Sequence, residues 1–284
     1  MMSVCRLRSH QFLSALFLGL ALSSCNGGHV VDQQPTADLL KQVPAAEWER
    51  LGQMRILFGH QSVGFNIIDG MRDVMKDNPA IKLNIVEIKA PPSPQGPALA
   101  HFRVGRNGEP NVKVDDFARH VNEAGDALDI AFFKFCFADA NAGTDVRAVF
   151  GHYKRVLSDL ETKHPRTTFV HVTMPLTTIQ TGWKVPVKRL IGKPIDGYAD
   201  NAKRNEYNEL LRTEYAGKSP FFDLAAIEST FPDGRRMSFG QDGRTYYAMA
   251  PANTVDGGHP NEVARRLVAE RLLVLLAELG RRKG

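Results

Sequence analysis

Short apolar runs alternate with amphipathic helical segments along most of this chain, and the alternation restricts the possible folds more than any other feature. The expected strands cover residues 55–58, 81–88, 129–135, 168–174 and 221–227. The expected helices cover residues 63–76, 114–124, 145–163, 200–215 and 261–279. Strands that alternate with helices pair mostly in parallel and carry helices on both faces of the sheet. We therefore predict an α/β domain built on a five-stranded sheet.

Three long segments between these elements, residues 90–112, 177–198 and 228–255, lack a strand or helix pattern. The first is rich in Pro and Gly, and long irregular loops in compact domains are commonly functional. In open parallel sheets, ligands bind beyond the carboxyl ends of the strands. We expect loop 90–112, loop 136–144, Ser62 and His259 to lie at that edge.

The first 24 residues have the features of an export signal rather than of folded structure. Arg6 and Arg8 precede an apolar run over residues 12–22, which is too short to span a membrane comfortably. The run is followed by a Leu-Ser-Ser-Cys motif that ends at Cys25 and resembles a bacterial lipobox. The resemblance implies cleavage before Cys25 and lipidation of its thiol. An ordinary signal peptide with an incidental cysteine is the alternative.

A lipid anchor at Cys25 implies a location in the cell envelope. The residue after the cysteine is Asn26 rather than Asp. If the cell is Gram-negative, this favours export to the outer membrane, facing the periplasm. Residues 25–46 are polar and interrupted by proline. We predict a signal peptide over 1–24, a tether over 25–46 and one folded domain over 47–284.

Charge and cysteine content exclude some classes of function. The net charge of +5 falls by two, to +3, when the signal peptide is removed, and no strongly basic run remains. The clusters at 235–236 and 281–283 are interpreted as solvated surface, so nucleic-acid binding is not expected. Cys136 is the one cysteine left after cleavage and lipidation, which rules out an intrachain disulfide. Its phenylalanine neighbours favour a buried thiol over a nucleophile.

The sequence DGGHPNE, residues 256–262, lies just before the last expected helix. Asp256 stands three residues ahead of His259 across two glycines, which lets the backbone turn tightly and brings a carboxylate to the imidazole. Ser62 lies between the first expected strand and the first expected helix. Together these residues favour a Ser-His-Asp triad. The alternative is that Ser62 is a helix N-cap and His259 a cap or surface residue.

These two blocks resemble those of the SGNH, or GDSL-type, hydrolase superfamily. The resemblance implies a flavodoxin-like three-layer α/β/α sandwich in which Ser62, His259 and Asp256 are catalytic. It also implies three oxyanion donors: the N–H of the nucleophile, a Gly after strand two and an Asn after strand three. The chain departs from the family pattern at its first block, His60-Gln61-Ser62-Val63-Gly64, and at Ala138, which occupies the slot of the expected Asn.

Candidates for the remaining oxyanion or substrate-binding positions follow from their place in the chain. We favour Gly105 over Gly96 as the glycine donor, with Asn107 close to it, and Asn141 as the substitute for the missing Asn. His60 is expected to line the pocket. Lys134 is expected either to extend to solvent from the strand end, pairing with Asp139, or to present a cation to an anionic substrate.

We predict a serine esterase that removes O-acetyl or other small acyl groups, with an envelope glycan as the expected carrier. Any ester that reaches the serine can react, so the triad specifies chemistry rather than substrate. An O-acyltransferase that uses the same residues is one alternative. A non-catalytic lipoprotein that binds an envelope glycan or partner is the other. No cofactor and no metal ion are expected, since no further His or carboxylate stands at ligand spacing from His60.

Overall fold

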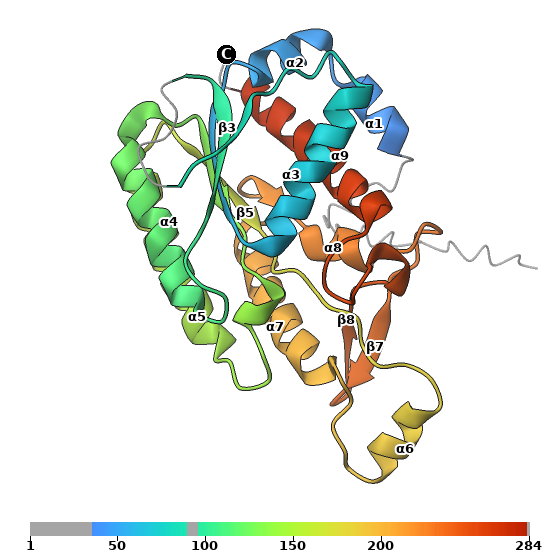
Figure 1. The fold of residues 1–284 in the computed structure, drawn as a ribbon. Helices are drawn as coiled ribbons and strands as arrows, with labels where there is room; N and C mark the ends of the chain where they lie inside the picture. The colour runs from blue at the N-terminus through green and yellow to red at the C-terminus, as the bar shows by residue number, and fades with distance from the viewer. Residues whose placement is uncertain (1–35, 90–95, 283–284) are drawn as a thin grey trace, which may run out of the picture. The chain divides into compact units, whose positions relative to one another are not determined.

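The computed structural model describes residues 36–89 and 96–282 (Figure 1). The predicted signal peptide, the lipidation site Cys25 and the first part of the predicted tether lie outside the described residues. Within the described ranges, no helix is both long enough and apolar enough to cross a membrane.

A six-stranded parallel sheet forms the centre of the domain, with the order β2-β3-β1-β4-β5-β6. The strands are β1 Arg55–His60, β2 Ile85–Glu87, β3 Ala98–Arg103, β4 Ile130–Phe133, β5 Thr168–Val172 and β6 Phe221–Phe222. Without the short edge strand β2, this order is the flavodoxin-like one, in which the chain reverses direction across the sheet beside β1. The predicted α/β class is confirmed, and the sheet has six strands rather than five.

Helices cover both faces of the sheet. The described helices are α1 Thr36–Gln42, α2 Ala45–Leu51, α3 Ser62–Asp77, α4 Pro110–Ala124, α5 Val146–Lys163, α6 Lys184–Leu190, α7 Tyr198–Tyr215, α8 Leu224–Ser229 and α9 Glu262–Arg281, of which α6 projects away from the sheet. Short 3₁₀ turns occur at Gly125–Ala127, Phe137–Asp139 and Pro251–Asn253. In Figure 1, α3 and α9 lie on one side of the strands and α4, α5 and α7 on the other, which makes the three layers.

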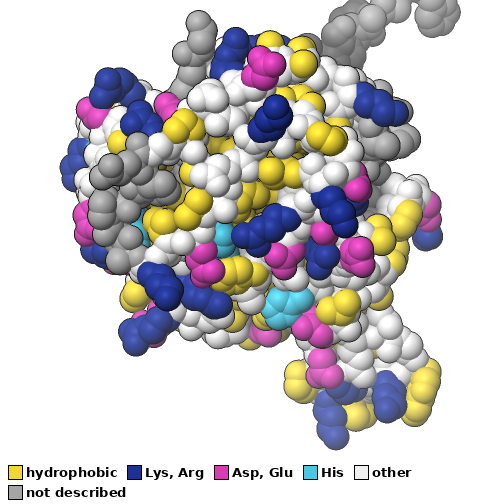
Figure 2. Space-filling view, turned by 45° about the horizontal axis from the view of Figure 1, so that its top comes forward, with side chains coloured by type: hydrophobic (Ala, Val, Ile, Leu, Met, Phe, Trp, Pro, Cys, Tyr) yellow, Lys and Arg dark blue, Asp and Glu magenta, His cyan; other side chains and the backbone are white. Residues whose placement is uncertain are grey.

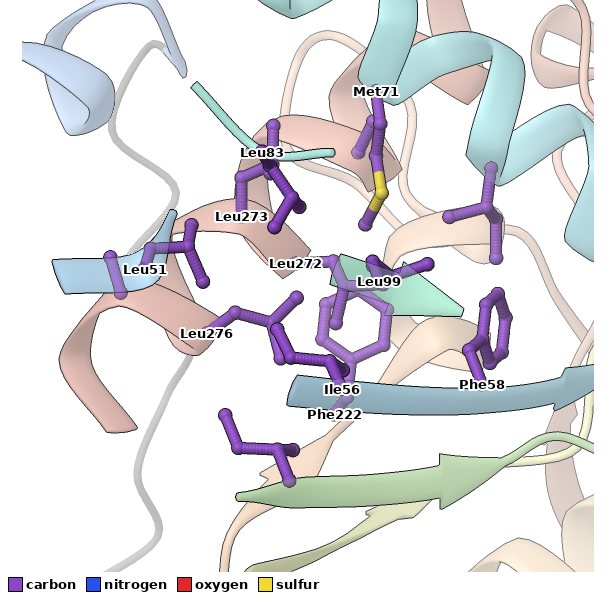
Figure 3. Close-up of a cluster of buried hydrophobic side chains, with 14 of the residues drawn as sticks. Leu51, Ile56, Phe58, Met71, Leu83, Leu99, Phe222, Leu272, Leu273 and Leu276 are labelled. Carbon is purple, nitrogen blue, oxygen red and sulfur yellow. The ribbon is translucent and has the colours of Figure 1, made fainter. Parts of the chain in front are cut away.

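Two hydrophobic cores result from the alternation of side chains along the strands. Ile56 and Phe58 of β1 point into the core beneath α3 and α9, whereas Leu57 points into the core beneath α4 and α5. Figure 3 shows the first of these cores, where β1 faces Leu272 and Leu276 of α9. Burial of one such side chain contributes about 1.5–3 kcal/mol.

The second predicted strand, 81–88, is largely wrong. Only Ile85–Glu87 pairs, at the sheet edge, and the strand beside β1 is Ala98–Arg103, inside the segment predicted to be a loop. Every residue of β3 except Arg103 is buried. The polar residues His101 and Arg103 and the nearby Pro and Gly residues weaken the strand pattern in the sequence. The segment is a strand because β1 and β2 pair with it on either side.

The fifth predicted strand also ends early. Residues 224–229 form α8, because the carboxylate of Asp223 accepts the N–H of Ala226 and caps a helix directly after Phe222. The segment 228–255 contains a hairpin, β7 Ser238–Gln241 and β8 Arg244–Tyr247, joined by Asp242 and Gly243 at φ 50° and 73°. Two consecutive residues with positive φ are the requirement of the tight turn that an Asp-Gly pair favours.

The N-terminal boundary of the domain differs from the predicted one. Thr36–Gln42 is helical, and Leu40 and Val43 belong to the core on the α9 side. Residues 40–43 of the predicted tether therefore pack with the folded domain, ahead of its predicted start at Glu47. Leu40 and Val43 are buried because α1 packs beside α9, which lies at the other end of the chain.

Candidate active site

Ser62 is the first residue of α3 and lies at the carboxyl end of the central strand β1. Its Oγ is 2.9 Å from Nε2 of His259, while Gln61 occupies the N-cap position without a side-chain cap. The Gln61 amide instead donates to the carbonyls of Val104 and Gly105, at 2.8 Å and 3.0 Å. The serine hydroxyl is therefore not used to cap the helix, and its neighbour ties the turn to the loop after β3.

His259 and Asp256 form the other half of the arrangement. Nδ1 of His259 is 2.6 Å from Oδ2 of Asp256, and the other carboxylate oxygen accepts the N–H groups of His259 and Gly258 at 2.8 Å and 3.0 Å. These backbone hydrogen bonds, followed by that with the ring, lower the pKa of Asp256 to about 2. An ionised carboxylate accepts only, so Nδ1 carries the proton, and the lone pair of Nε2 faces Ser62.

The tight backbone turn between the Asp and the His depends on both glycines. Gly257 has φ +94°, and a Cβ there would lie 2.8 Å from the hydroxyl of Thr178. A Cβ on Gly258 would lie 2.9 Å from the ring of Phe137, which itself stands edge-on to His259 at 5.6 Å between ring centroids. The ring of Phe137 therefore packs closely against both Gly258 and the imidazole.

Helix α9 begins immediately after this turn. Asn261 is its N-cap, with the side-chain oxygen 3.0 Å from the N–H of Ala264. Pro260 precedes the cap instead of occupying the first helical position, and it forms a bridge with Thr254. The hydroxyl of Thr254 donates to the carbonyl of His259 at 2.7 Å. These contacts fix the position of the imidazole relative to a long buried helix.

The backbone N–H of Ser62 stands in the first turn of α3, where no preceding turn supplies a carbonyl partner. It is the candidate oxyanion donor that the geometry supports. Gly105 does not fit this role, because its N–H donates to the carboxylate of Asp116 at 2.8 Å. Its φ of +49° and its closeness to Lys113 explain why glycine is needed there.

The two candidate asparagines lie in different surroundings. Oδ1 of Asn107 accepts a hydrogen bond from Lys113 at 2.8 Å, which leaves the amide N–H groups without a partner among the described contacts. Asn141 is exposed and closes a local turn with the N–H of Gly143 at 2.9 Å. No described contact joins Asn141 to Ser62 or His259, so the structure does not place it as the substitute donor.

His60 does not line a pocket, since it is completely buried under Gly64 of α3. Its Nδ1 is 2.9 Å from the carbonyl of Gln61, and its Nε2 is 3.0 Å from Nδ1 of His101. A carbonyl only accepts, so Nδ1 of His60 donates, and His60 is neutral because burial lowers its pKa to about 3. His60 supports the turn that carries Ser62 from below.

Lys134 neither reaches solvent nor faces a substrate, because it is 1% exposed. Its Nζ donates to the carbonyl of Phe135, and burial lowers its pKa to about 8. Asp139 pairs with Lys113 instead, at 2.6 Å and with both side chains fully buried. Asp139 also accepts the N–H groups of Cys136 and Gly108, so it joins the loop after β4 to the loop after β3.

Cys136 is buried as predicted. In the described ranges, no three side chains of His, Cys, Asp or Glu gather closely enough to hold a metal ion.

A groove of about 630 Å³ opens beside His259. It is lined by Phe137, Thr177, Thr178, Ile179, Gln180, Asp196, Gly197, Asp200, Arg204, Asp256, Gly257, Gly258 and His259. Many of the wall residues come from the two ends of segment 177–198, which the sequence predicts to be an irregular loop. The lining combines polar and apolar groups and includes one buried cation, Arg204, and three carboxylates, Asp196, Asp200 and Asp256.

Arg204 belongs to a polar stripe on α7 that sequence reasoning missed. Asn201, Arg204 and Asn208 follow helical spacing, yet all three are buried. Asn208 bonds the backbone of Met174, and Asn201 bonds that of Thr177. Buried backbone groups outside a sheet need such partners. Three polar residues at spacings of three and four were the available signal for a helix that supports an irregular loop.

Comparisons with known proteins bear mainly on the fold. A scan against models of protein families gives no match, and a search of curated proteins gives none. Among solved structures, a peptidoglycan O-acetylesterase is similar, with a TM-score of 0.50, 10% identity and coverage of 87% of this chain and 98% of that one. The fold is like that of SGNH hydrolases.

Two other solved structures are similar to this chain with lower TM-scores. A G-D-S-L family protein from Desulfitobacterium hafniense has a TM-score of 0.46 and 9% identity over 78% of this chain and 98% of its own. A carbohydrate esterase family 3 protein from Talaromyces cellulolyticus has a TM-score of 0.46 and 14% identity over 80% and 97%.

Proposed function

We propose that this protein is a serine ester hydrolase in which Ser62 is the nucleophile, His259 the general base and Asp256 the residue that orients the base. The observation that carries the proposal is the continuous chain from Ser62 Oγ through His259 to the Asp256 carboxylate, at 2.9 Å and 2.6 Å. These residues come from opposite ends of the sequence, 197 positions apart for the first pair. A helix cap needs no such partner.

In the acylation step, Oγ of Ser62 forms a bond to the ester carbonyl while its proton passes to Nε2 of His259. The ester C–O bond then breaks, and His259 returns the proton to the departing alcohol. Water next attacks the acyl-serine with His259 as base, which releases the acid and restores the hydroxyl. Asp256 remains ionised throughout and stabilises the imidazolium.

Negative charge develops on the carbonyl oxygen during both attacks. The N–H of Ser62 and the amino-terminal end of α3 would lie beside that oxygen, since the dipole of a helix favours an anion at its N-terminus. We propose the free amide of Asn107, oriented by Lys113, as a second donor. Losing one good donor of this kind costs about 10²–10³-fold in rate.

We propose small acyl groups, such as acetyl, on an envelope glycan as the substrate. A groove whose walls include threonine, glutamine and aspartate side chains beside the Phe137 ring suits a carbohydrate better than a long acyl chain. The similar fold of a peptidoglycan O-acetylesterase supports the same choice. An acceptor hydroxyl that enters in place of water would make the same residues an acyltransferase.

The lipid anchor remains part of the proposal and rests on the motif that ends at Cys25. A lipidated chain would fractionate with membranes, and its intact mass would include the acyl groups. Cys25→Ala should release the protein into the soluble fraction. Wild-type protein recovered unlipidated from the soluble fraction would refute the anchor.

The hydrolase proposal is tested with p-nitrophenyl acetate on the full chain, beside Ser62→Ala and His259→Ala. We expect turnover and a fluorophosphonate label on Ser62, both lost in the two variants. Ser158→Ala, at an exposed position on α5, is the matched control and should react like wild type. Folded protein with no turnover and no label would contradict the proposal, whereas acetyl transfer to an added sugar alcohol would identify a transferase.

A further inference from the structure

Large apolar side chains are exposed together on the segment that contains α6. In the part of the chain that the structure describes, seven large hydrophobic side chains are exposed, and four belong to residues 183–191. Their exposed fractions are 75% for Trp183, 47% for Val187, 87% for Leu190 and 57% for Ile191. None of the residues of α6 is buried. A concentration of this kind marks an interaction surface, whereas single exposed apolar residues need no explanation.

The same segment is strongly basic. Lys184, Lys188, Arg189 and Lys193 occur between residues 181 and 195, and this stretch contains no Asp or Glu. Lys188 is paired with Asp196 at 3.3 Å, but no described carboxylate lies within ion-pair distance of the other three. The segment therefore has a local excess of positive charge, which favours a negatively charged binding partner.

A hollow of about 860 Å³ lies between this segment and the β7–β8 hairpin. It contains the side chains of Arg189, Lys193 and Arg244 and one carboxylate, Asp242. The hairpin contributes one cation, Arg244, and one carboxylate, Asp242, to the wall of this hollow. Figure 2 shows yellow and dark blue side chains gathered on the lobe that projects at the lower right of the molecule, where Figure 1 places α6.

We propose that the α6 lobe, defined as residues 181–195, docks on the surface of an anionic lipid bilayer. Tryptophan and branched apolar side chains enter the boundary between headgroups and acyl chains, and neighbouring lysines and arginines contact lipid phosphates. A neutral apolar partner would satisfy the exposed Trp183 and Leu190 but would leave the cations without counterions. Exposed apolar side chains together with cations that lack a described carboxylate partner favour a surface with an apolar interior and a negatively charged exterior.

Docking would also orient the candidate active site. The lobe is the middle of segment 177–198, and both ends of that segment line the groove beside His259. A docked lobe would therefore hold the mouth of the groove near the bilayer surface. This inference does not depend on the proposed hydrolase activity, because it concerns where the lobe binds and not what Ser62 does.

The experiment uses the fluorescence of Trp183 as a local reporter. The chain has two tryptophans, and Trp48 is 4% exposed, so Trp48→Phe leaves Trp183 as the sole emitter. The full chain carrying this change and Cys25→Ser is mixed with vesicles of equal parts phosphatidylglycerol and phosphatidylcholine. We expect a blue shift and quenching by brominated acyl chains. Attachment through any other part of the chain does not produce these signals.

Charge variants test the basic component. Lys184→Glu with Lys193→Glu should weaken the response to anionic vesicles by more than about tenfold, since each basic residue near an anionic surface contributes to binding. The matched control, Lys82→Glu with Lys163→Glu, makes the same change in net charge at exposed positions outside the lobe and should retain the stronger response.

Three results with the folded Trp183 reporter protein would overturn the proposal. The first is unchanged Trp183 emission with anionic vesicles. The second is an equal response to pure phosphatidylcholine vesicles, which would remove the requirement for negative charge. The third is a response to a soluble anionic polysaccharide but not to vesicles, which would assign the lobe to a glycan. Ester turnover measured on the same samples reports separately on the proposed function.

Discussion

Asp256 shows how much a single carboxylate determines in this site. One of its oxygens holds the N–H groups of Gly258 and His259, and the other holds the imidazole. The residue thus shapes the turn and also selects the tautomer that presents a lone pair to Ser62. Because these hydrogen bonds lower its pKa to about 2, the carboxylate is ionised at neutral pH.

Asp256→Asn should keep the oxygen that accepts the backbone N–H groups but lose the charge beside the ring. An amide oriented this way no longer requires a proton on Nδ1 of His259. We expect kcat for ester hydrolysis to fall by roughly 10⁴-fold with little change in Tm. Asp115→Asn is the control, since Asp115 is also exposed and bonded to a histidine, His152. Equal activities of the two variants would refute the role of Asp256.

At the level of elements, the site depends on the contact between the 256–259 turn and the 3₁₀ turn after β4. Phe137 of that 3₁₀ turn packs against Gly258 and against the ring of His259. Its carbonyl is held by Nε of Arg204 at 2.8 Å, which connects the arrangement to α7. Three elements thus determine where the imidazole stands.

Gly258→Ala should push the turn away from Phe137, because the added Cβ would lie 2.9 Å from the ring. A misplacement of about 1 Å costs about 10²-fold in rate, and we expect a loss of that size in kcat. Phe137→Leu in the same chain should restore part of the activity by making room. Gly151→Ala, where a Cβ meets nothing within 4 Å, should remain fully active. No recovery in the double variant would show that the clash is not the cause.

At the scale of the whole molecule, the fold buries several ionisable side chains. Glu228 is buried, and its carboxyl accepts the N–H of Leu176 through one oxygen while the other has no described partner. Burial raises its pKa to about 8. The proton on the unpartnered oxygen is thus retained in the folded state at pH values where the unfolded chain has released it.

The consequence is a pH dependence of stability with a defined sign. A carboxyl whose pKa is raised on folding costs nothing below its ordinary value of 4.5, and stability is lost as the pH rises toward about 8. The lowered pKa of Lys134 acts in the opposite sense, but above about 8. We expect Tm of the wild type to fall more between about pH 5 and about pH 8 than Tm of Glu228→Gln. The exposed Glu278→Gln should follow the wild type, and parallel curves for all three proteins would contradict this assignment.

The first helix offers a test of where the domain begins. Leu40 is 7% exposed in the core beside α9, so Leu40→Ala should lower the free energy of unfolding. We expect a loss of about 2 kcal/mol by urea denaturation, at the low end for a buried leucine. Glu49→Ala, at an exposed position of α2, should change it by less than about 0.5 kcal/mol. An unaffected Leu40→Ala protein would restore the tether interpretation for residues 36–46.

The sequence by itself determined the α/β class and indicated Ser62, Asp256 and His259 as candidate catalytic residues. Both depend on local patterns: helical and strand periodicity for the fold, and a two-glycine turn at a helix start for the Asp-His pair. A turn of four residues fixes its own geometry, so it can be interpreted without knowledge of the rest of the chain.

Tertiary structure decided what depends on residues distant in sequence. β3 is a strand because β1 and β2 pair with it on either side, and α1 is a helix packed on α9 at the other end of the chain. Gly105 does not fit the predicted oxyanion role because its N–H donates to Asp116. Lys134 reaches neither solvent nor a substrate because it is buried. Hydrogen-bond partners and burial are set by the packing of distant segments, which no local pattern records.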